Sequence, residues 1–317
     1  MQLSQLKKNE IRVFAPASVA NVGCGFDIFG FALHVPGDEV YLKITDNPGI
    51  KINAISGDDN RLPKDAKLNT AGVSLQAMME FLQTDFGVEI EIHKKMPIGS
   101  GLGSSAASSV ASVYALNEML TEPLEKRQLL EFAIAGEKIT SGDSIHLDNI
   151  AACLYGGFIL VRSKQPVDIV RIPTPDGLHC VVLHPQIEIK TEASRKLLRK
   201  QITLEQAVIQ WGNVAGTVTA LFRSDFELLK RSLDDVVVVP DRAELIPKYY
   251  QIYEAAMSAG AIGCSISGSG PSVFALSPDE TLARKIGQAM ADVLDGLDIG
   301  SDLYISAINN DGPKVIQ

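Results

Sequence analysis

The chain is organised around one segment, Pro97-Ile98-Gly99-Ser100-Gly101-Leu102-Gly103-Ser104-Ser105-Ala106-Ala107. It separates an alternating apolar run at residues 88–93, which predicts a strand, from small residues at 106–120, which predict a helix. The three alternate glycines let backbone N–H groups turn toward an anion, because no Cβ stands in the way. The free N–H groups at the helix start favour an anion by up to about 2 kcal/mol, and Ser104 and Ser105 add hydroxyl groups. The segment is therefore interpreted as an anion cradle.

Two other phosphate-binding loops do not fit this segment. No Lys follows the last glycine, so the GxxxxGK[ST] pattern is absent. The glycines run G-x-G-x-G, and the next acids, Glu118 and Glu122, lack the strand-helix-strand context of a dinucleotide fingerprint. On glycine spacing alone, a plain Gly/Ser turn that caps a helix remains an alternative.

Bulk composition bounds the class of protein. A length of 317 residues with 46% hydrophobic residues fits two globular domains that share a cleft. The formal net charge of -9 argues against a broad basic surface, so neither nucleic acid nor a membrane is expected as a partner. No signal-peptide pattern and no apolar run of about 18 residues is found, which predicts a cytoplasmic location. The cysteines lack metal-site or disulfide spacing and are expected to be buried hydrophobes: Cys24, Cys153, Cys180 and Cys264.

The order of the expected elements favours an α+β fold with two closely packed halves. Strands are expected at residues 12–15, 38–45, 50–55, 88–93, 157–161, 180–183, 262–266, 272–276 and 302–307. Helices are expected at residues 68–86, 106–120, 124–139, 192–200, 204–222, 226–233, 243–259 and 282–294. A boundary near residues 173–177 divides the chain into an N-terminal domain, 1–173, and a C-terminal domain, 174–317.

The glycine-rich segment resembles, at every position, the ATP-binding signature of the superfamily named for galactose, homoserine, mevalonate and phosphomevalonate (GHMP) kinases. Two further stretches resemble the same superfamily in the same order: APASVANVGCGFD at residues 15–27 and GAIGCSISGSGPS at residues 260–272. The resemblance implies a two-domain fold with mixed and antiparallel sheets, and an active site in the cleft between an ATP-binding N-terminal domain and a C-terminal domain. It assigns residues 97–107, with Asn69 at the base pocket, to ATP.

Within the superfamily, finer patterns are similar to the members that phosphorylate the side-chain hydroxyl of L-homoserine. These patterns are SVAN at 18–21 with GFD at 25–27, GDSIHLDN at 142–149, and TEASR at 191–195 with VPDR at 239–242. The resemblance implies that the following residues surround the bound amino acid: Asn21, Asp27, His146, Thr191, Arg195, Arg242 and Gly268. Homoserine carries an ammonium group that an acid such as Asp27 can bind, and a carboxylate that Arg195 and Arg242 can bind through charge-assisted hydrogen bonds.

The resemblance also implies Mg²⁺ with ATP. Glu137 matches the metal-binding acid of the superfamily, and with Ser105 it is expected to hold the ion. Asn149 stands where several members carry a catalytic Asp, and their N-terminal Lys is missing here. Because an amide cannot take a proton, catalysis by positioning and electrostatic stabilisation is expected. The expected catalytic set is Glu137, Asn149, Thr191 and Arg195.

Two alternatives stay open at the level of sequence. The first is another small-molecule kinase of the superfamily, although a sugar has no carboxylate for the two arginines. The second is a catalytically silent sensor of ATP or a metabolite on the same fold. Without the resemblance, Arg195 and Arg242 would be interpreted as surface or loop cations, His146 as a core histidine and Glu137 as a solvated helix residue. A homodimer is expected only from how such enzymes commonly assemble.

Overall fold

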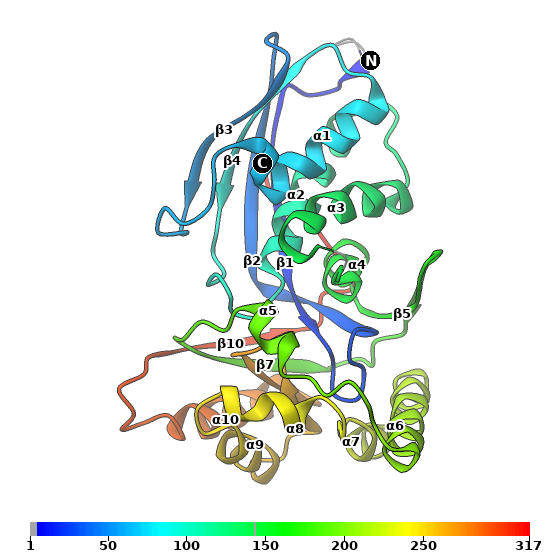
Figure 1. Ribbon diagram of the computed structural model, residues 1–317, viewed down its shortest axis with the longest axis vertical. Coiled ribbons are helices and arrows are strands. Elements are labelled where there is room, and N and C mark those ends of the chain that lie inside the picture. The colour runs from blue at the N-terminus through cyan, green and yellow to red at the C-terminus, as the bar shows by residue number, and fades with distance from the viewer. Residues whose placement is uncertain (1–4, 143) are drawn as a thin grey trace.

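The computed structural model describes residues 5–142 and 144–317 and has the expected α+β architecture. Asp143, the second residue of the 142–149 pattern, lies outside the described residues. Figure 1 shows two halves stacked along the long axis, one sheet with helices above and a second, smaller sheet with helices below.

The upper half is a seven-stranded sheet covered by helices. The sheet runs β11-β1-β2-β4-β3, and β5 joins it through β2 and carries β6 at its edge. Its strands are β1 (Glu10–Ala20), β2 (Phe29–Thr45), β3 (Gly49–Ser56), β4 (Gly87–His93), β5 (Phe158–Lys164), β6 (Val167–Ile172) and β11 (Lys314–Val315). All pairs are antiparallel except β3 with β4. The helical elements of this half are η2 (Ala66–Leu68), α1 (Thr70–Leu82), α2 (Ser104–Met119), α3 (Lys126–Ser141) and α4 (Leu147–Tyr155).

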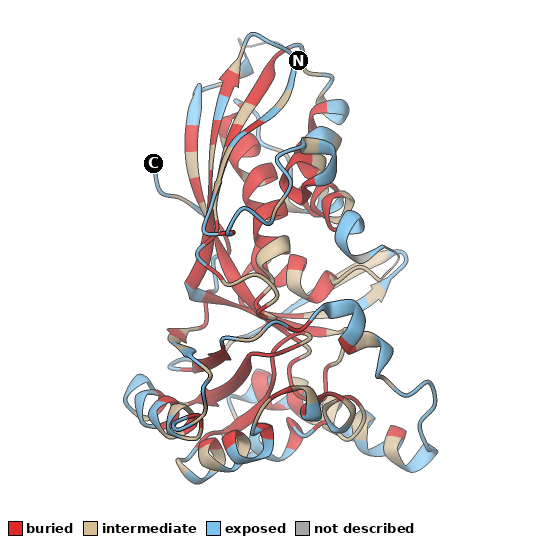
Figure 2. Cartoon of the chain, turned by 60° about the vertical axis from the view of Figure 1, so that its left-hand side comes forward, coloured by how far each residue is buried: buried red, intermediate tan, exposed pale blue. Residues whose placement is uncertain are grey.

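Helix α2 is the centre of this half. Its small side chains are buried almost throughout, and it packs directly on β1 and β2, with α1 and α3 against its other sides. Close packing on a sheet needs small residues, which explains the Ser- and Ala-rich sequence. Figure 2 shows the buried residues concentrated on α2 and the strands, and the exposed ones on the outer helices. The N-terminus of α2 is therefore held rigidly.

The lower half is a four-stranded antiparallel sheet in the order β10-β7-β9-β8. Its strands are β7 (His179–Pro185), β8 (Gly263–Ile266), β9 (Val273–Ser277) and β10 (Ser301–Ala307). α9 (Tyr249–Ser258) and α10 (Glu280–Asp292) pack on the sheet and close a second apolar core. The other helical elements are α5 (Thr191–Lys196), α6 (Leu204–Arg223), α7 (Phe226–Ser232), α8 (Val239–Arg242) and η3 (Ala243–Leu245).

Several elements differ from the sequence expectation. The single helix expected at 243–259 is wrong: η3 ends before Pro247, and α9 starts only at Tyr249. Proline lacks an N–H and disfavours helical backbone in the residue before it. The sequence also missed α4, β6 and β11, which are too short to show a clear period.

Two smaller expectations can be compared with the structure. All four cysteines are buried and unpaired, as expected. In the described part of the chain, no helix is both long and apolar enough to cross a membrane.

Candidate active site

The glycine loop follows a backbone path that glycine makes accessible. Gly99, Gly101 and Gly103 have φ angles of 71°, 78° and 69°, in a region that residues with a Cβ rarely adopt. A Cβ on Gly101 would also lie 2.4 Å from the carbonyl oxygen of Ser267. The alternate glycines therefore serve both the turn and a close approach to the C-terminal glycine turn.

The glycine loop leads into the start of α2, where the first backbone N–H groups are free to donate hydrogen bonds. The N-cap residue is Gly103, and no side chain in the described ranges caps the first N–H groups. Ser104 and Ser105 line the cavity beside them. Ser100 Oγ is buried without a hydrogen-bond partner among the described residues. Free donors at a helix N-terminus form a site for an anion such as phosphate.

The three sequence motifs meet at this loop. The Ser18 N–H donates to the carbonyl oxygen of Leu102 at 3.1 Å. Ser267 Oγ donates to the carbonyl oxygen of Gly101 at 2.8 Å, although the two residues are 166 positions apart. Segments from both ends of the chain therefore fix the anion-binding backbone.

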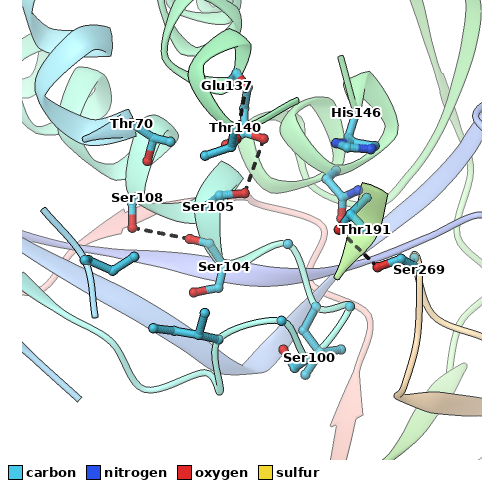
Figure 3. Close-up of a pocket in the computed structure, with 18 of the residues that line it drawn as sticks. Thr70, Ser100, Ser104, Ser105, Ser108, Glu137, Thr140, His146, Thr191 and Ser269 are labelled. Carbon is cyan, nitrogen blue, oxygen red and sulfur yellow. Dashed lines mark hydrogen bonds between the residues drawn. The ribbon is translucent and has the colours of Figure 1, made fainter. Parts of the chain in front are cut away.

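A cavity of about 270 Å³ lies where the three motifs meet (Figure 3). Most of the expected site residues line it: Asn21, Asn69, residues 98–105, Glu137, His146, Asn149, Thr191, Arg195, Arg242 and Gly268. Four expected residues are not among those that line it: Pro97, Ala106, Ala107 and Asp27. Ala106 and Ala107 are 1% and 0% exposed, so they belong to the core beneath the loop.

Glu137 and Ser105 form the carboxylate side of the cavity. Ser105 Oγ donates to Glu137 Oε2 at 3.2 Å, the contact drawn in Figure 3. Burial raises the pKa of Glu137 to about 7, against the opposing effects of the Ser105 hydrogen bond and the Lys94 charge. A buried carboxylate of this kind gains from a cation, and the hard oxygen donors suit Mg²⁺.

Arg195 and Arg242 form the cationic side. Their guanidinium groups lie 5.6 and 5.1 Å from the centre of the Phe26 ring. Arg242 Nη1 donates to the Gly268 carbonyl oxygen at 2.9 Å. The Nε atom of each arginine is buried without a hydrogen-bond partner in the described part of the chain. Burial and the charge of Arg195 lower the pKa of Arg242 to about 10, so the side chain stays charged near neutral pH. A buried Arg242 and a half-buried Arg195, both with unused donors, suit a carboxylate.

Asp27 lies behind these cations. Its carboxylate accepts from Arg195 Nη2 at 2.8 Å and from Lys164 Nζ at 2.9 Å. Burial alone would raise the pKa of Asp27, but the two cations outweigh it and lower the pKa. Asn21 Oδ1 accepts from the Asp27 N–H at 2.8 Å, and Asn21 Nδ2 donates to the Gly268 carbonyl oxygen at 2.8 Å. Asp27 therefore orients Arg195, and Asn21 ties the loop to the lower half.

Three polar side chains complete the wall. Burial and the nearby Arg195 lower the pKa of His146 to about 4, so the imidazole is neutral near pH 7. Asn149 Oδ1 accepts a hydrogen bond from Ser18 Oγ at 2.9 Å. Figure 3 shows Thr191 facing Ser269, and their hydroxyl oxygens are 3.3 Å apart.

The sequence did not predict a buried lysine at the mouth of the loop. Lys94 pairs with buried Asp38 and donates to the Ser104 carbonyl oxygen at 2.7 Å and to Ser108 Oγ at 2.8 Å. It also lines the cavity. Its place directly after β4 was the available signal, but nothing in the sequence shows that Asp38, which lies on β2, is its partner.

Comparison with protein families matches both halves of the chain. The description "GHMP kinases N terminal domain" fits residues 69–157, and "GHMP kinases C terminal" fits residues 217–296. A crystal structure of L. major mevalonate kinase with R-mevalonate shares the fold, with a TM-score of 0.70 at 18% identity, covering 96% of this chain and 97% of that one. The fold, the glycine loop and these matches define the class, the GHMP kinases.

Comparison with individual relatives identifies the family within the GHMP kinases. The homoserine kinase of Chlorobium phaeobacteroides (strain BS1) is 43% identical over 315 residues, which cover 96% of this chain and 98% of that protein. The homoserine kinase of Xylella fastidiosa (strain M12) is 36% identical over 308 residues, covering 97% and 94%. The crystal structure of homoserine kinase from Cytophaga hutchinsonii is 54% identical with a TM-score of 0.96, covering 98% and 99%. The chain belongs to the homoserine kinase family.

Proposed function

We propose that this enzyme transfers the γ-phosphoryl group of ATP to the side-chain hydroxyl of L-homoserine, giving O-phospho-L-homoserine for threonine biosynthesis. One observation carries the proposal. A single cavity has the open N-terminus of α2 on one side and, on the other, two guanidinium groups whose buried Nε donors are unused. The first side suits the phosphates of ATP, and the second suits the carboxylate of an amino acid.

The phosphate side is assigned to ATP and Mg²⁺. In this proposal the loop amides and the Ser100 hydroxyl bind phosphate oxygens, and Asn69 borders the base. Ser105 and Glu137 would hold Mg²⁺, which needs only one or two protein oxygens besides phosphate and water. When bound, the ion neutralises charge on the transferring phosphoryl group. The raised pKa of Glu137 fits a carboxylate that ionises fully only beside a cation.

The amino-acid side is assigned to homoserine. Arg195 and Arg242 bind its carboxylate. Asp27 orients Arg195 from behind the cavity wall and provides a negative charge for the ammonium group. Neutral His146, Thr191 and Asn21 offer hydrogen bonds to the polar remainder, and the Gly268 carbonyl oxygen already holds Asn21 and Arg242 in place.

The hydroxyl proton passes to phosphate or water rather than to a strong side-chain base. Among the described residues that line the cavity, Glu137 is the only carboxylate, and it is assigned to the metal. Asn149 cannot accept a proton as a base. A kcat–pH profile with an essential base that disappears on substitution of one lining residue would contradict this step.

The test is ADP release from Mg-ATP with L-homoserine, L-threonine, L-serine, mevalonate and galactose in parallel, with Glu137→Ala as control. We expect turnover with homoserine alone and its loss in the control. Turnover with mevalonate or galactose would still support the assignment of the glycine loop to ATP. It would contradict the assignment of Arg195 and Arg242 to the carboxylate of an amino acid. ATP binding without turnover on any acceptor would favour a sensor.

Three accompanying proposals complete the description. The chain divides near residue 173 into an ATP-binding domain and a second domain. It works in the cytoplasm, which agrees with four free, buried thiols. It pairs with a second copy of itself.

A further inference from the structure

The hairpin of β5 and β6 places a lysine against the carboxylate of Asp27. Lys164 is the last residue of β5, and it is exposed together with the turn residues Gln165 and Pro166. Lys164 Nζ donates to Asp27 Oδ2 at 2.9 Å, while Arg195 Nη2 donates to Asp27 Oδ1 at 2.8 Å. Figure 1 shows β5 at the side of the molecule, close to the level where the two halves meet. Each oxygen of this carboxylate therefore already has a cationic partner.

The backbone of Asp27 is held in an uncommon conformation. Its φ of 61° lies in the left-handed region, which residues with a Cβ rarely adopt. Asn21, with a φ of 56°, accepts the Asp27 N–H through Oδ1 at 2.8 Å. Strained backbone that its neighbours maintain commonly marks a functional residue. Because the carboxylate is fixed by its own backbone, any change of partner must come from the cations around it.

Of the two cations on Asp27, Lys164 is the one that can leave. Its side chain is 41% exposed, against 29% for that of Arg195. Arg195 also lies over the Phe26 ring at 5.6 Å and lines the cavity, whereas Lys164 is not among the residues that line it. An exposed pair of lysine and carboxylate contributes little free energy, since water solvates both partners well. Lys164 can therefore move into water at small cost.

The charge of Lys164 nevertheless acts inside the cavity. Burial and Arg195 lower the pKa of His146, a residue that lines the cavity, to about 4. Lys164 and Arg242 act in the same direction, and Asp27 opposes them. A cation whose field reaches the cavity repels the ammonium group of an amino acid and competes with it for the same carboxylate.

We propose that Lys164 is an internal competitor of the substrate: it occupies Asp27 in the empty site and is exchanged for the α-ammonium group of the bound amino acid. This inference rests on the proposed function, because it takes L-homoserine as the ligand. The carboxylate of homoserine binds the arginines first, which gives its ammonium group a high effective concentration near Asp27. The exchange keeps Asp27, whose side chain is only 18% exposed, paired with a cation in both states.

The affinities of two matched ligands test the exchange. Lys164→Met should bind L-homoserine about threefold more tightly than wild type, on the scale of one exposed ion pair. It should not bind 4-hydroxybutyrate more tightly, because that ligand has no ammonium group to compete with Lys164. Ligand-observed NMR titration in the presence of ADP gives both Kd values without turnover. The titration is made at pH 8, since burial and the charge of Asp27 raise the pKa of neighbouring Asp148 to about 6.

Two further substitutions on the same hairpin are the controls. Lys164→Arg keeps a cation at this position and should gain no affinity for homoserine. Arg162→Met removes the ion pair of Arg162 with Asp168, which does not involve Asp27, and should change neither Kd. Circular dichroism checks that all three variants fold.

Acetylation of the whole protein gives a direct measure of the exchange. Saturating homoserine should make Lys164 react faster than in the free protein, because its amine moves into water, and mass spectrometry of peptides measures the rate. 4-hydroxybutyrate should not have this effect. Lys51, which pairs with Glu89 and is 71% exposed, reports the general rate of the reagent.

The outcomes separate this inference from the proposed reaction. Equal changes in the affinity for the two ligands, or no change, would overturn the exchange and leave Lys164 as an anchor of Asp27. Acetylation of Lys164 that is unchanged or slower with homoserine bound would overturn it as well. Either result together with turnover of homoserine would leave the proposed reaction intact. Binding of homoserine without turnover would instead overturn the reaction, and the two affinities would still decide the role of Lys164.

Discussion

Arg195 and Arg242 share the face of Phe26 but differ in what holds them. Arg195 is paired with Asp27, whereas Arg242 is anchored by a neutral carbonyl oxygen, that of Gly268. The charge of Arg195 repels that of Arg242, and burial adds to the cost of the Arg242 charge. An incoming carboxylate relieves that repulsion, so the pair is preorganised for an anion.

The first prediction concerns the planar guanidinium group of Arg242. Arg242→Lys keeps the charge but loses the bidentate geometry, so the KM for homoserine should rise about 10²-fold, which corresponds to roughly 2.7 kcal/mol. The KM for ATP should stay within about twofold. Steady-state kinetics with each substrate varied separately measure both. Arg199→Lys is the matched control, because Arg199 pairs with Asp241 and does not line the cavity. Equal effects of the two substitutions would contradict the assignment.

The second prediction concerns the pH dependence caused by His146. Burial and Arg195 lower its pKa from 6.5 to about 4. Below pH 6.5 the unfolded chain therefore binds a proton that the folded protein does not, and stability is lost as the pH falls toward 4. His146→Gln removes this loss, so the variant should gain about 2 kcal/mol relative to wild type between pH 7 and pH 5.

Urea unfolding at the two pH values measures the effect of His146→Gln. His34→Gln, at an exposed histidine, is the matched control substitution. Parallel pH dependence of wild type and His146→Gln would show that the imidazole is not held neutral by the fold.

At the scale of elements, the site depends on a rigid turn between β4 and α2. The Gly101 carbonyl oxygen of this turn is fixed by Ser267 of the second glycine turn, while the first N–H groups of α2 have no side-chain cap. A helix that begins without a side-chain cap leaves its first N–H groups unsatisfied. The uncapped start of α2 therefore lowers the stability of the fold locally, and bound phosphate would offset this loss.

The third prediction distinguishes two effects of a Cβ at Gly101: a steric clash with Ser267 and backbone strain. Gly101→Ala adds a Cβ that would lie 2.4 Å from the Ser267 carbonyl oxygen, at a φ of 78°. Gly296→Ala has a nearly equal φ of 80° but nothing within 4 Å. Both should lose roughly 1–2 kcal/mol of stability to strain. Only Gly101→Ala should also raise the KM for ATP, by about tenfold or more. Similar ATP kinetics in the two variants would mean that the loop tolerates the displacement.

At the scale of the whole molecule, the chain ends tie the two halves together. After completing the lower sheet with β10, the chain returns to the upper sheet as β11, where Val315 pairs with Val13. The Arg12 carbonyl oxygen accepts from the N–H groups of Ile316 and Gln317 at 2.9 and 3.3 Å. The last residues therefore complete the edge of β1, which also carries Asn21 just beyond its end.

The fourth prediction concerns that final strand. Deleting residues 313–317 removes several backbone hydrogen bonds, each contributing about 0.5–1.5 kcal/mol, so stability should fall by about 2–4 kcal/mol. Val315→Thr, which keeps the backbone pairing, should cost less. Thermal unfolding by calorimetry measures both, and we expect one transition, because the halves share the active-site contacts. An unchanged midpoint after the deletion would show that β11 contributes nothing to the upper sheet.

Local features of this protein were determined by sequence alone. The glycine spacing at 99, 101 and 103 permits a positive-φ turn, the strand before it follows from an alternating apolar pattern, and the helix after it follows from a run of small residues. All three are short-range properties. Most of the residues assigned to the site by motif do line one cavity. Their roles remain proposals for the experiments above.

Only the tertiary structure decided which distant groups meet. Asn21 and Gly268 are 247 positions apart, and Lys94 finds Asp38 on a neighbouring strand. The strand β11 also depends on β1, a partner far along the chain, whereas the break before α9 follows locally from Pro247. On α6, Leu221 is buried whereas Trp211 and Phe222 are exposed, and only packing shows which apolar side chains of the helix face the core. The physical reason is that pattern specifies a local backbone state, whereas charge pairing, burial and pKa depend on which surfaces the whole fold brings into contact.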